Sequence, residues 1–294
     1  MFKISVIIPV HNRTELLRRA VRSVVAQTLQ PFEIVVVDDG SDPDAAEATR
    51  ALCAQIQGAR LIRHARNLGA AAARNTGIAH VHGDYIAFLD SDDEWLANKL
   101  QIQRDFLLQT GAKVCACSFH YMRLRQGAAP MEETRHPATL HSVRSLVWGC
   151  TICPGSGLVI SKALAAEVGP QDATLRRYED WDWLIRLTAR GYAVPVLRQP
   201  LIRIHTSSYV PFADVDEACR LFQAKHDRTF RSFGLVAGLK FRSTLQIERA
   251  SYALKSGQFA RASGHTVCGI ALWPLRNRHF WAAALRSLLQ GSRA

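Results

Sequence analysis

The chain has 294 residues, of which 48% are hydrophobic and 21% are charged, so it can bury a core and is not a disordered chain. Its net charge of +12 is unevenly spread, because residues 1–217 hold 24 Lys/Arg and 23 Asp/Glu whereas residues 218–294 hold 13 and 2. The charge therefore belongs to a basic tail and does not indicate nucleic-acid binding by the first 217 residues.

In the first 110 residues, apolar runs alternate with helical patterns. Short apolar runs that end at turn residues predict strands, and apolar residues spaced by three and four predict helices. The predicted strands are 3–10, 33–37, 59–64 and 85–90. The predicted helices are 16–25, 43–57 and 70–81. This alternation is typical of an α/β fold with a mostly parallel sheet covered by helices on both faces.

Two of the predicted helices begin with capping signals. Asn12 with Glu15 three residues later resembles a capping box for the first helix. Asp42 followed by Pro43 is a good N-cap and first helical residue for the second helix.

Polar residues follow three of the predicted strands. They are PVHNR (9–13), DDGS (38–41) and DSDDEW (90–95). Ligands of parallel α/β sheets bind outside the carboxyl ends of the strands, which is where all three stretches fall. We therefore expect them to meet at one edge of the sheet and to form a binding site there.

The last of these stretches places Asp90, Asp92, Asp93 and Glu94 directly after a buried strand. Repulsion makes such a cluster unfavourable unless water or a cation screens it, and acids at i and i+2 point the same way. A metal site is one interpretation. The other is a solvated turn that caps the next helix, since Asp favours both turns and N-caps.

Beyond residue 111 the pattern is mixed. The segments 113–124 and 154–161 are predicted strands, and 193–197 and 201–205 are predicted short closing strands. Residues 178–191 are predicted to be a turn that opens into a helix. From about residue 214 the chain is predicted to be helical, with a break at SGQF (256–259).

Five stretches resemble the family 2 glycosyltransferases in order and in spacing. They are ISVIIPVHNR (4–13), VVVDDGS (35–41), NLGAAAARNTGI (67–78), YIAFLDSDDEW (85–95) and YEDWDWLIRL (178–187). The resemblance covers roughly residues 3–206, and it is specific because five motifs agree. It implies a GT-A fold, a nucleotide-sugar donor, most often a UDP-sugar, a divalent cation, and inversion at the anomeric carbon.

The resemblance also implies which residues bind the donor. Asp39 would accept a hydrogen bond from the base, although the same Asp-Gly sequence also suits a plain turn before a helix. The residues Pro9, Val10 and Asn12 would line the base and ribose, mostly through backbone atoms. Arg74 would contact the base or the diphosphate, or else lie on a solvated helix face.

In the same way, the resemblance implies the metal ligands. Asp90 and Asp92 correspond to the family's Asp-x-Asp, with Asp92 a direct ligand of Mn²⁺ or Mg²⁺ and Asp90 near the ribose or the metal. Asp93 would be a further ligand or only a helix cap. His205 lies where some relatives carry a residue that reaches the diphosphate or metal, or it is an ordinary loop histidine.

The acceptor hydroxyl must lose a proton as it attacks, so a carboxylate base is needed. The family assigns this role to the Asp of its Glu-Asp pair, which is Asp180 here, beside Glu179. We expect the helix start to keep Asp180 ionised and to lower its pKa. The alternative interpretation is that Asp180 only caps the helix. Trp181 and Trp183 would stack on sugar rings or fill the core.

These expectations divide the chain into a GT-A domain, residues 1–213, and a basic helical region, residues 214–294. The first domain would have a nucleotide-binding half (1–110) and an acceptor half (111–213). The helices of 218–294, with Trp273, would either contact an anionic membrane surface peripherally or cap the domain with a solvated basic face. We expect no nucleic-acid partner, because no recognised module accompanies the charge.

No apolar run reaches the roughly 20 residues of a spanning helix, and the first residues lack a signal-peptide layout. The predicted location is therefore the cytoplasm, with peripheral attachment to the inner face of the membrane. The predicted function is transfer of a sugar to a glycan or lipid-linked acceptor in cell-surface polysaccharide synthesis. A sugar nucleotidyltransferase is an alternative, but the expected Gly-rich phosphate loop is missing after the first strand. A binding scaffold without turnover is the other alternative.

Overall fold

The computed structural model describes residues 2–125, 128–205 and 210–274. The chain divides into two compact units, which are treated separately below. The sheet unit comprises Met1–Leu146 and Cys150–Ser208, and the helical unit comprises Val147–Gly149 and Tyr209–Ala294. The predicted division after residue 213, like the division into two halves at residue 110, stays a prediction.

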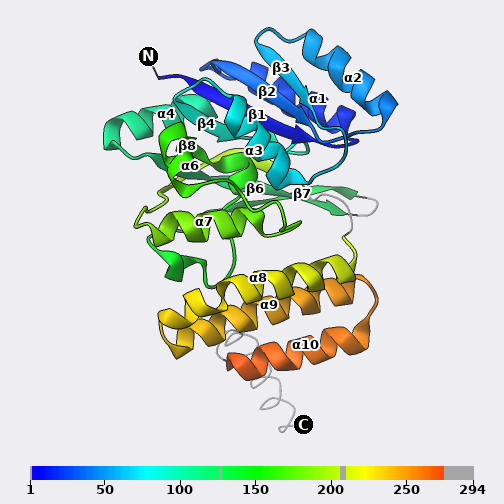
Figure 1. Ribbon diagram of the computed structural model, residues 1–294, viewed down its shortest axis with the longest axis vertical. Helices are drawn as coiled ribbons and strands as arrows, with labels where there is room; N and C mark the ends of the chain where they lie inside the picture. Colours follow the sequence, from blue (N-terminus) through cyan, green and yellow to red (C-terminus); the bar gives the residue numbers. More distant parts are fainter. Residues whose placement is uncertain (1, 126–127, 206–209, 275–294) are drawn as a thin grey trace. The chain divides into compact units, whose positions relative to one another are not determined.

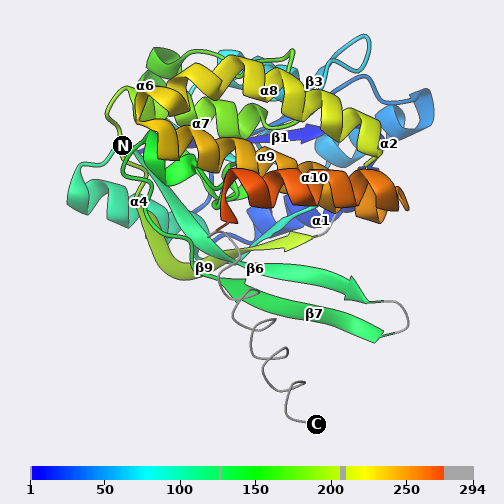
Figure 2. The ribbon, with the colours of Figure 1, turned by 90° about the horizontal axis from the view of Figure 1, so that it is seen from below.

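The described part of the sheet unit is built on nine strands (Figure 1). They are β1 (Ile4–Val10), β2 (Glu33–Asp38), β3 (Ala59–Arg63), β4 (Tyr85–Phe88), β5 (Glu94–Trp95), β6 (Val114–Arg125), β7 (Ala128–Arg135), β8 (Val159–Ser161) and β9 (Val196–His205). Their order across the sheet is β3-β2-β1-β4-β8-β6-β9-β5, and β7 pairs with β6 as a hairpin (Figure 2).

The predicted parallel arrangement is confirmed for the first four strands, in which β1 lies between β2 and β4. Every residue of β1 and β2 is buried, as expected for strands covered on both faces. The strand β8 runs antiparallel to β4 and β6, whereas β6 and β9 are parallel. The result is an α/β fold whose first half is a doubly covered parallel sheet.

The sheet unit also contains seven helices and one short 3-10 helix within the described ranges. They are α1 (Thr14–Val25), α2 (Pro43–Ala54), α3 (Ala70–His80), α4 (Lys99–Thr110), η1 (Val143–Leu146), α5 (Pro154–Gly157), α6 (Lys162–Val168) and α7 (Glu179–Ala189). Apolar residues of α1 share a core with Val6 and Ile8 of β1, whereas α3 packs against Ile7 through Gly77. Alternate residues of a strand point to opposite faces, so these helices cover both sides.

Several local predictions are wrong. Residues 154–157 form a helical turn and not a strand, because Pro154 starts α5 and the Gly157 N–H donates to the Cys153 carbonyl. The two short strands predicted at 193–197 and 201–205 are one strand, β9. The helix expected after the acidic stretch is α4, for which no bounds were predicted, and the elements α6, β5 and β7 were not predicted.

The capping box predicted at Asn12 is wrong as well. Asn12 has a left-handed backbone (φ 52°), and the N-cap position of α1 falls to Arg13 without a side-chain hydrogen bond. The Asn12 side chain instead exchanges two hydrogen bonds with Asp42. Asp42 does occupy the N-cap position of α2 before Pro43, as predicted, but its side chain makes no capping hydrogen bond.

The helical unit contains α8 (Phe212–Ser232), α9 (Leu235–Lys255) and α10 (Phe259–Leu272), and the predicted break at 256–259 is confirmed. Aromatic rings pack between α8 and α9, with the Phe230 and Phe241 ring centroids 4.2 Å apart. Within the described part of the chain, no helix is long and apolar enough to cross a membrane. Residues 275–294 of the predicted basic region, which include Phe280 and Trp281, lie outside the described residues.

Candidate active site

The three polar stretches predicted to converge do meet at the carboxyl ends of β1, β2 and β4. The Asn12 N–H donates to Ser41 Oγ at 2.9 Å, which joins the loop after β1 to the loop after β2. Arg13 Nη1 donates to Asp92 Oδ2 at 2.9 Å, which joins the loop after β1 to the loop after β4. One edge of the sheet therefore carries all three clusters.

The loop after β2 is held by its own carboxylates. Asp39 is buried, and it accepts hydrogen bonds from the backbone N–H groups of Leu68 (2.9 Å) and Gly69 (2.7 Å). Its Oδ1 also lies 2.8 Å from His64 Nδ1. At Gly40 (φ 70°), a Cβ atom would lie 2.3 Å from a backbone carbon of Arg66. The turn interpretation therefore applies here, while the contact of Asp39 with a base stays a prediction.

Pro9 and Val10 are buried in β1 and pair with Val37 and Asp38 of β2. The Val10 carbonyl accepts a hydrogen bond from the Asp39 N–H at 2.8 Å. The missing N–H of Pro9 is tolerated because Pro9 lies beyond the last β1–β4 pair, Ile7 with Phe88. Both residues thus lie at the edge of the sheet that carries the polar stretches, and their contact with a base or ribose stays a prediction.

In the loop after β4, the three aspartates have different partners. Asp90 Oδ1 accepts from Arg74 Nη2 at 2.6 Å, and Asp92 pairs with Arg13. Asp93 is buried and accepts from the Ser156 hydroxyl (2.5 Å) and the His205 N–H (3.0 Å). Asp93 therefore fastens the loop, whereas Asp90 and Asp92 each keep one oxygen that accepts no hydrogen bond from the described residues.

The electrostatics of this loop favour a cation. Burial, followed by the charge of Asp90, raises the pKa of Asp92 above its ordinary value. The same two causes raise the pKa of Asp93 well above its ordinary value. A positive ion between Asp90 and Asp92 would relieve this repulsion.

The donor atoms of Asp90 and Asp92 fit Mg²⁺ or Mn²⁺, because both are hard carboxylate oxygens. Within residues 2–125, 128–205 and 210–274, no group of three His, Cys, Asp or Glu side chains is arranged as a complete metal site. Mg²⁺ is commonly held by one or two carboxylates together with substrate phosphates. The loop is thus suited to a cation that arrives with, and is shared by, a phosphate-bearing ligand.

Ser156 is a site residue that the sequence analysis missed. Its hydroxyl accepts from the Asp90 N–H (3.1 Å) and donates to Asp93, and its carbonyl accepts from the Trp95 indole N–H (2.8 Å). A Cβ atom on the preceding Gly155 would lie 2.3 Å from Asp90 Oδ2. The signal that could have found this turn is PGSG itself, since Pro and Gly break a strand.

Arg74 is buried in α3 and joins two motifs that are far apart in sequence. Its guanidinium donates to Asp90 and, at 2.9 Å, to Glu179 Oε1. Burial by itself would lower the pKa of Arg74, but the charges of these two carboxylates outweigh it and raise the pKa. The interpretation of Arg74 as a solvated helix arginine is therefore wrong, and its contact with a donor stays a prediction.

Asp180 lies in the first turn of α7, where its Oδ1 accepts from the Trp181 N–H at 2.7 Å. Burial, followed by the charge of Glu179, raises the pKa of Asp180 to about 7, so the prediction of a lowered pKa is wrong. The helix start does stabilise the carboxylate, but burial and the neighbouring charge outweigh it. A carboxylate with this pKa can both hold and release a proton near neutral pH.

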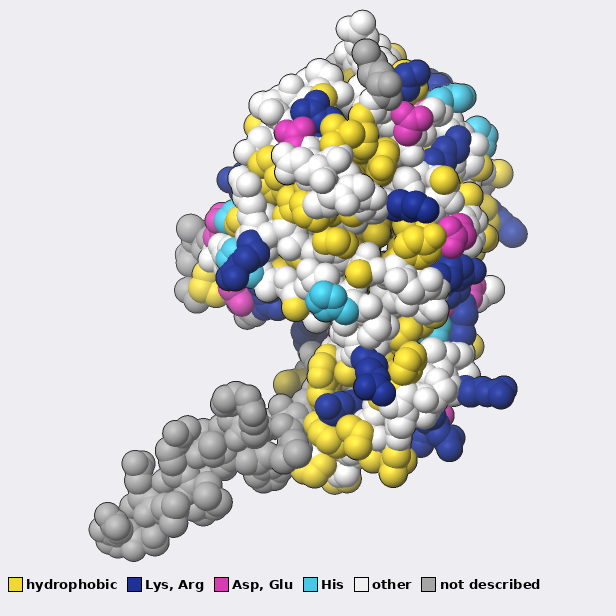
Figure 3. Space-filling model, turned by 90° about the vertical axis from the view of Figure 1, so that its left-hand side faces the viewer, with side chains coloured by type: hydrophobic (Ala, Val, Ile, Leu, Met, Phe, Trp, Pro, Cys, Tyr) yellow, Lys and Arg dark blue, Asp and Glu magenta, His cyan; other side chains and the backbone are white. Residues whose placement is uncertain are grey.

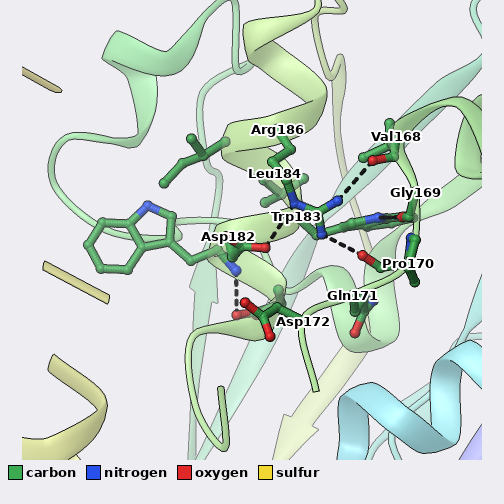
Figure 4. Close-up of polar contacts among 12 residues, drawn as sticks. Val168, Gly169, Pro170, Gln171, Asp172, Asp182, Trp183, Leu184 and Arg186 are labelled. Carbon is green, nitrogen blue, oxygen red and sulfur yellow. Dashed lines mark hydrogen bonds and ion pairs between the residues drawn. The ribbon is translucent and has the colours of Figure 1, made fainter. Parts of the chain in front are cut away.

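The side chain of Arg186 acts as a clamp that holds the helix α7 in place (Figure 4). Arg186 donates to the buried Asp182 (2.9 Å) and to the carbonyls of Val168 (2.8 Å) and Pro170 (2.7 Å). Trp183 donates to the Gly169 carbonyl at 2.8 Å. Trp181 and Trp183 are both buried, so they fill the core. The clamp fixes the direction in which α7 presents Glu179 and Asp180.

His205 ends β9 and lies at the acidic loop. Its N–H donates to Asp93, and its ring Nε2 lies 2.8 Å from Glu94 Oε1. The structure thus places His205 beside the predicted metal motif, and its contact with a diphosphate or metal stays a prediction.

The similar proteins are bacterial glycosyltransferases. TuaG of Bacillus subtilis, a putative teichuronic acid biosynthesis glycosyltransferase, is 32% identical over 156 residues, which cover 50% of this chain and 59% of TuaG. WfgD of Escherichia coli, a UDP-Glc:α-D-GlcNAc-diphosphoundecaprenol β-1,3-glucosyltransferase, is 36% identical over 37% of this chain and 42% of WfgD. An uncharacterized glycosyltransferase of Rickettsia conorii is 45% identical over 118 residues, and the chain spans only 19% of its length.

The fold is similar to that of Staphylococcus aureus TarS, residues 1–349, with a TM-score of 0.60 and 16% identity over 90% of both chains. This likeness supports the GT-A-type α/β fold with a C-terminal helical region. The model of the family described as Glycosyl transferase family 2 matches residues 5–169, which include β1 to β4, the acidic loop and Ser156. The chain therefore belongs to glycosyl transferase family 2.

Proposed function

We propose that this protein is an inverting glycosyltransferase that moves a sugar from a UDP-sugar to a hydroxyl of a glycan or lipid-linked acceptor. The observation that carries the proposal is the link through Arg74, which joins Asp90 of the acidic loop to Glu179 beside Asp180. This link brings a cation-suited carboxylate pair and a carboxylate base into one site. WfgD is named for a UDP-Glc donor and a diphosphoundecaprenol-linked acceptor, and TarS was solved with UDP and UDP-GlcNAc.

Asp180 is the base in this proposal. Its pKa of about 7 leaves a substantial ionised fraction at neutral pH, and the ionised form can accept the acceptor's proton during attack. Because Glu179 pairs with Arg74, it is Asp180 that remains to meet the acceptor. Attack from the face opposite the leaving diphosphate gives inversion.

Asp90 and Asp92 would hold Mn²⁺ or Mg²⁺. When bound, the cation stabilises the negative charge that develops on the departing diphosphate. Arg74 holds Asp90 in place through a buried ion pair, and Arg13 does the same for Asp92 at the surface. Asp39, Pro9, Val10 and Asn12 would surround the nucleoside at the same edge of the sheet.

We also propose that the helical unit contacts an anionic membrane surface from the cytoplasmic side, where a lipid-linked acceptor would be met. Apolar side chains are exposed on its helices: Leu235 is 74% exposed, Phe259 68% and Val267 67%. Figure 3 shows hydrophobic side chains between Lys and Arg side chains on one face of this unit. A surface of this kind suits the interface of an anionic bilayer.

The membrane proposal is tested by sedimentation with liposomes that contain anionic lipid. Leu235→Ser with Phe259→Ser should reduce the bound fraction several-fold while leaving donor binding intact. Leu108→Ser, which changes an apolar side chain 60% exposed on α4, is the matched control. Equal sedimentation of all three proteins would remove the proposal.

The donor proposal is tested by thermal shift with UDP, GDP, dTDP and CMP, each with and without Mn²⁺. A ligand that binds only the folded protein raises the melting temperature. We expect a Mn²⁺-dependent shift with UDP that persists in Asp180→Asn and is lost in Asp92→Ala. Turnover of a UDP-sugar should be lost in both variants. A shift by UDP without any turnover in the wild type would instead favour a binding scaffold.

A further inference from the structure

A hollow of about 500 Å³ in the sheet unit adjoins the acidic loop but does not include Asp90, Asp92 or Asp180. It lies between α1 and the end of the acidic loop, residues 94–97. Its charged lining residues are Glu15, Arg18, Arg19, Arg22, Glu94 and Arg203. A volume of this size is within the range of small-molecule sites.

The charge in this hollow is positive. Four arginines and two glutamates give a net charge of +2. Arg18, Arg19 and Arg22 come from α1 and Arg203 from β9, so two separate elements direct guanidinium groups to one place. Positive groups that are held together in a concave surface concentrate anions there.

The four arginines divide into two pairs. Arg19 contacts Glu94 at 3.2 Å and donates to the Asp92 carbonyl, and Arg18 lies 3.6 Å from Glu15. Arg22 and Arg203, in contrast, have no carboxylate within ion-pair distance in the part of the chain that the structure describes. Two guanidinium groups in the hollow are therefore available to an incoming anion.

We infer that this hollow binds a phosphate or diphosphate group. Guanidinium groups pair with phosphate oxygens through two parallel hydrogen bonds, and two or more of them match a group that carries several negative oxygens. The lining also includes Ala26, Leu96 and Ala97, which give an attached carbon chain an apolar surface. The site is separate from the donor site, whose acidic side chains would repel an anion without a cation.

Arg19 connects this hollow to the acidic loop. It lines the hollow and holds both the Asp92 carbonyl and Glu94, which in turn contacts His205. An anion that draws Arg19 toward itself would loosen these contacts. The inference does not depend on the proposed sugar transfer. Through Arg19, however, an anion bound in the hollow would affect the loop that would hold the cation.

Calorimetric titration with inorganic pyrophosphate in the presence of EDTA tests the inference, because the cation-dependent donor site is then inactive. The variant is Arg22→Ala with Arg203→Ala, and the matched control is Arg50→Ala with Arg198→Ala, which removes the same charge from exposed positions on α2 and β9. We expect the first pair to weaken binding at least tenfold and the control to change it less than twofold. Asp92→Ala should bind as the wild type does.

Pyrophosphate binding that is the same in Arg22→Ala/Arg203→Ala as in the wild type would overturn the inference, because the ligand would then bind elsewhere on the protein. Absence of binding to the wild type would overturn it as well. A parallel titration with farnesyl diphosphate distinguishes the sources of the ligand. Affinity at least tenfold above that of pyrophosphate supports a lipid-linked diphosphate, and equal affinity supports a free one. The Mn²⁺-dependent shift by UDP is a separate measurement, so failure of either proposal is recognised independently.

Discussion

Two acidic stretches, DDGS after β2 and DSDD after β4, follow the two strands that flank β1, and they behave differently. In the first, Asp39 accepts two backbone N–H groups and Asp38 accepts the Ser41 N–H, so the carboxylates build the loop. In the second, burial and mutual repulsion raise the pKa of both Asp92 and Asp93. Carboxylates that accept hydrogen bonds from the chain, such as Asp39 and Asp93, form structure. Asp90 and Asp92, which repel each other, would be stabilised by a bound cation.

The largest expected effect is that of Asp92→Ala. Removal of this carboxylate should weaken Mn²⁺-dependent binding of UDP by about 100-fold or more, because a cation contributes several kcal/mol of charge stabilisation. Calorimetric titration with and without Mn²⁺ measures it. The free energy of unfolding should stay equal or rise, since a repelling charge is removed. Unchanged affinity in both conditions would contradict the metal assignment.

Asp39→Ala, unlike Asp92→Ala, should lower the free energy of unfolding. The partly exposed N–H groups of Leu68 and Gly69 lose a charged acceptor, and each of these hydrogen bonds contributes about 1–2 kcal/mol, so we expect a loss of roughly 2–4 kcal/mol. Urea denaturation measures the change. Asp42→Ala, at an exposed position in the same loop, is the control and should lose less than about 1 kcal/mol. Similar losses in both variants would remove the contrast between the two acidic stretches.

Ser156→Ala tests whether the second acidic stretch, DSDD, is held in place by its hydrogen bonds with Ser156. The variant removes the hydroxyl that bonds Asp93 and the Asp90 N–H, and should cost about 1–3 kcal/mol of stability as well as weakening Mn²⁺-dependent UDP binding. Ser161→Ala is the matched control, since it removes the N-cap of α6 at a cost of about 1 kcal/mol and should leave UDP binding unchanged. Equal effects on UDP binding would show that Ser156 has no special role in the loop.

The effect of Asp180→Asn on stability should depend on pH. The folded protein holds the Asp180 proton up to about pH 7, whereas the unfolded chain releases it near pH 4, so this group's contribution to stability falls as the pH rises through that window. Asp180→Asn should therefore gain more in melting temperature over the wild type at pH 8.5 than at pH 4. Turnover by the wild type should rise with pH through about 7. A gain that is equal at both pH values would contradict the raised pKa.

The first half of the fold could be predicted because its signals are local. Apolar runs and turn residues located β1 to β4, and the parallel arrangement then brought their polar ends to one edge. The residues that complete the site could not be found in this way. Ser156 meets Asp90 across 66 positions, and Arg74 meets Glu179 across 105.

The pKa of Asp180 could not be predicted for a related reason. A helix N-terminus is visible in the sequence, and by itself it lowers the pKa of a carboxylic acid. Burial and the distance to Glu179 depend on how α7 is clamped by Arg186 against Val168 and Pro170, which is a property of the packed chain. The sequence pattern thus identifies Asp180, but the packing of the folded chain determines its pKa.

The fastening of Asp93 has a consequence for how the protein folds during synthesis. Asp93 meets Ser156 and then His205, so its loop acquires its last contact only after a further 112 residues have left the ribosome. Contacts this distant in sequence slow folding, because a long loop must close before they form. A nascent chain that ends before β9 should therefore carry its first four strands with the acidic loop still open, and would depend on chaperones during that interval.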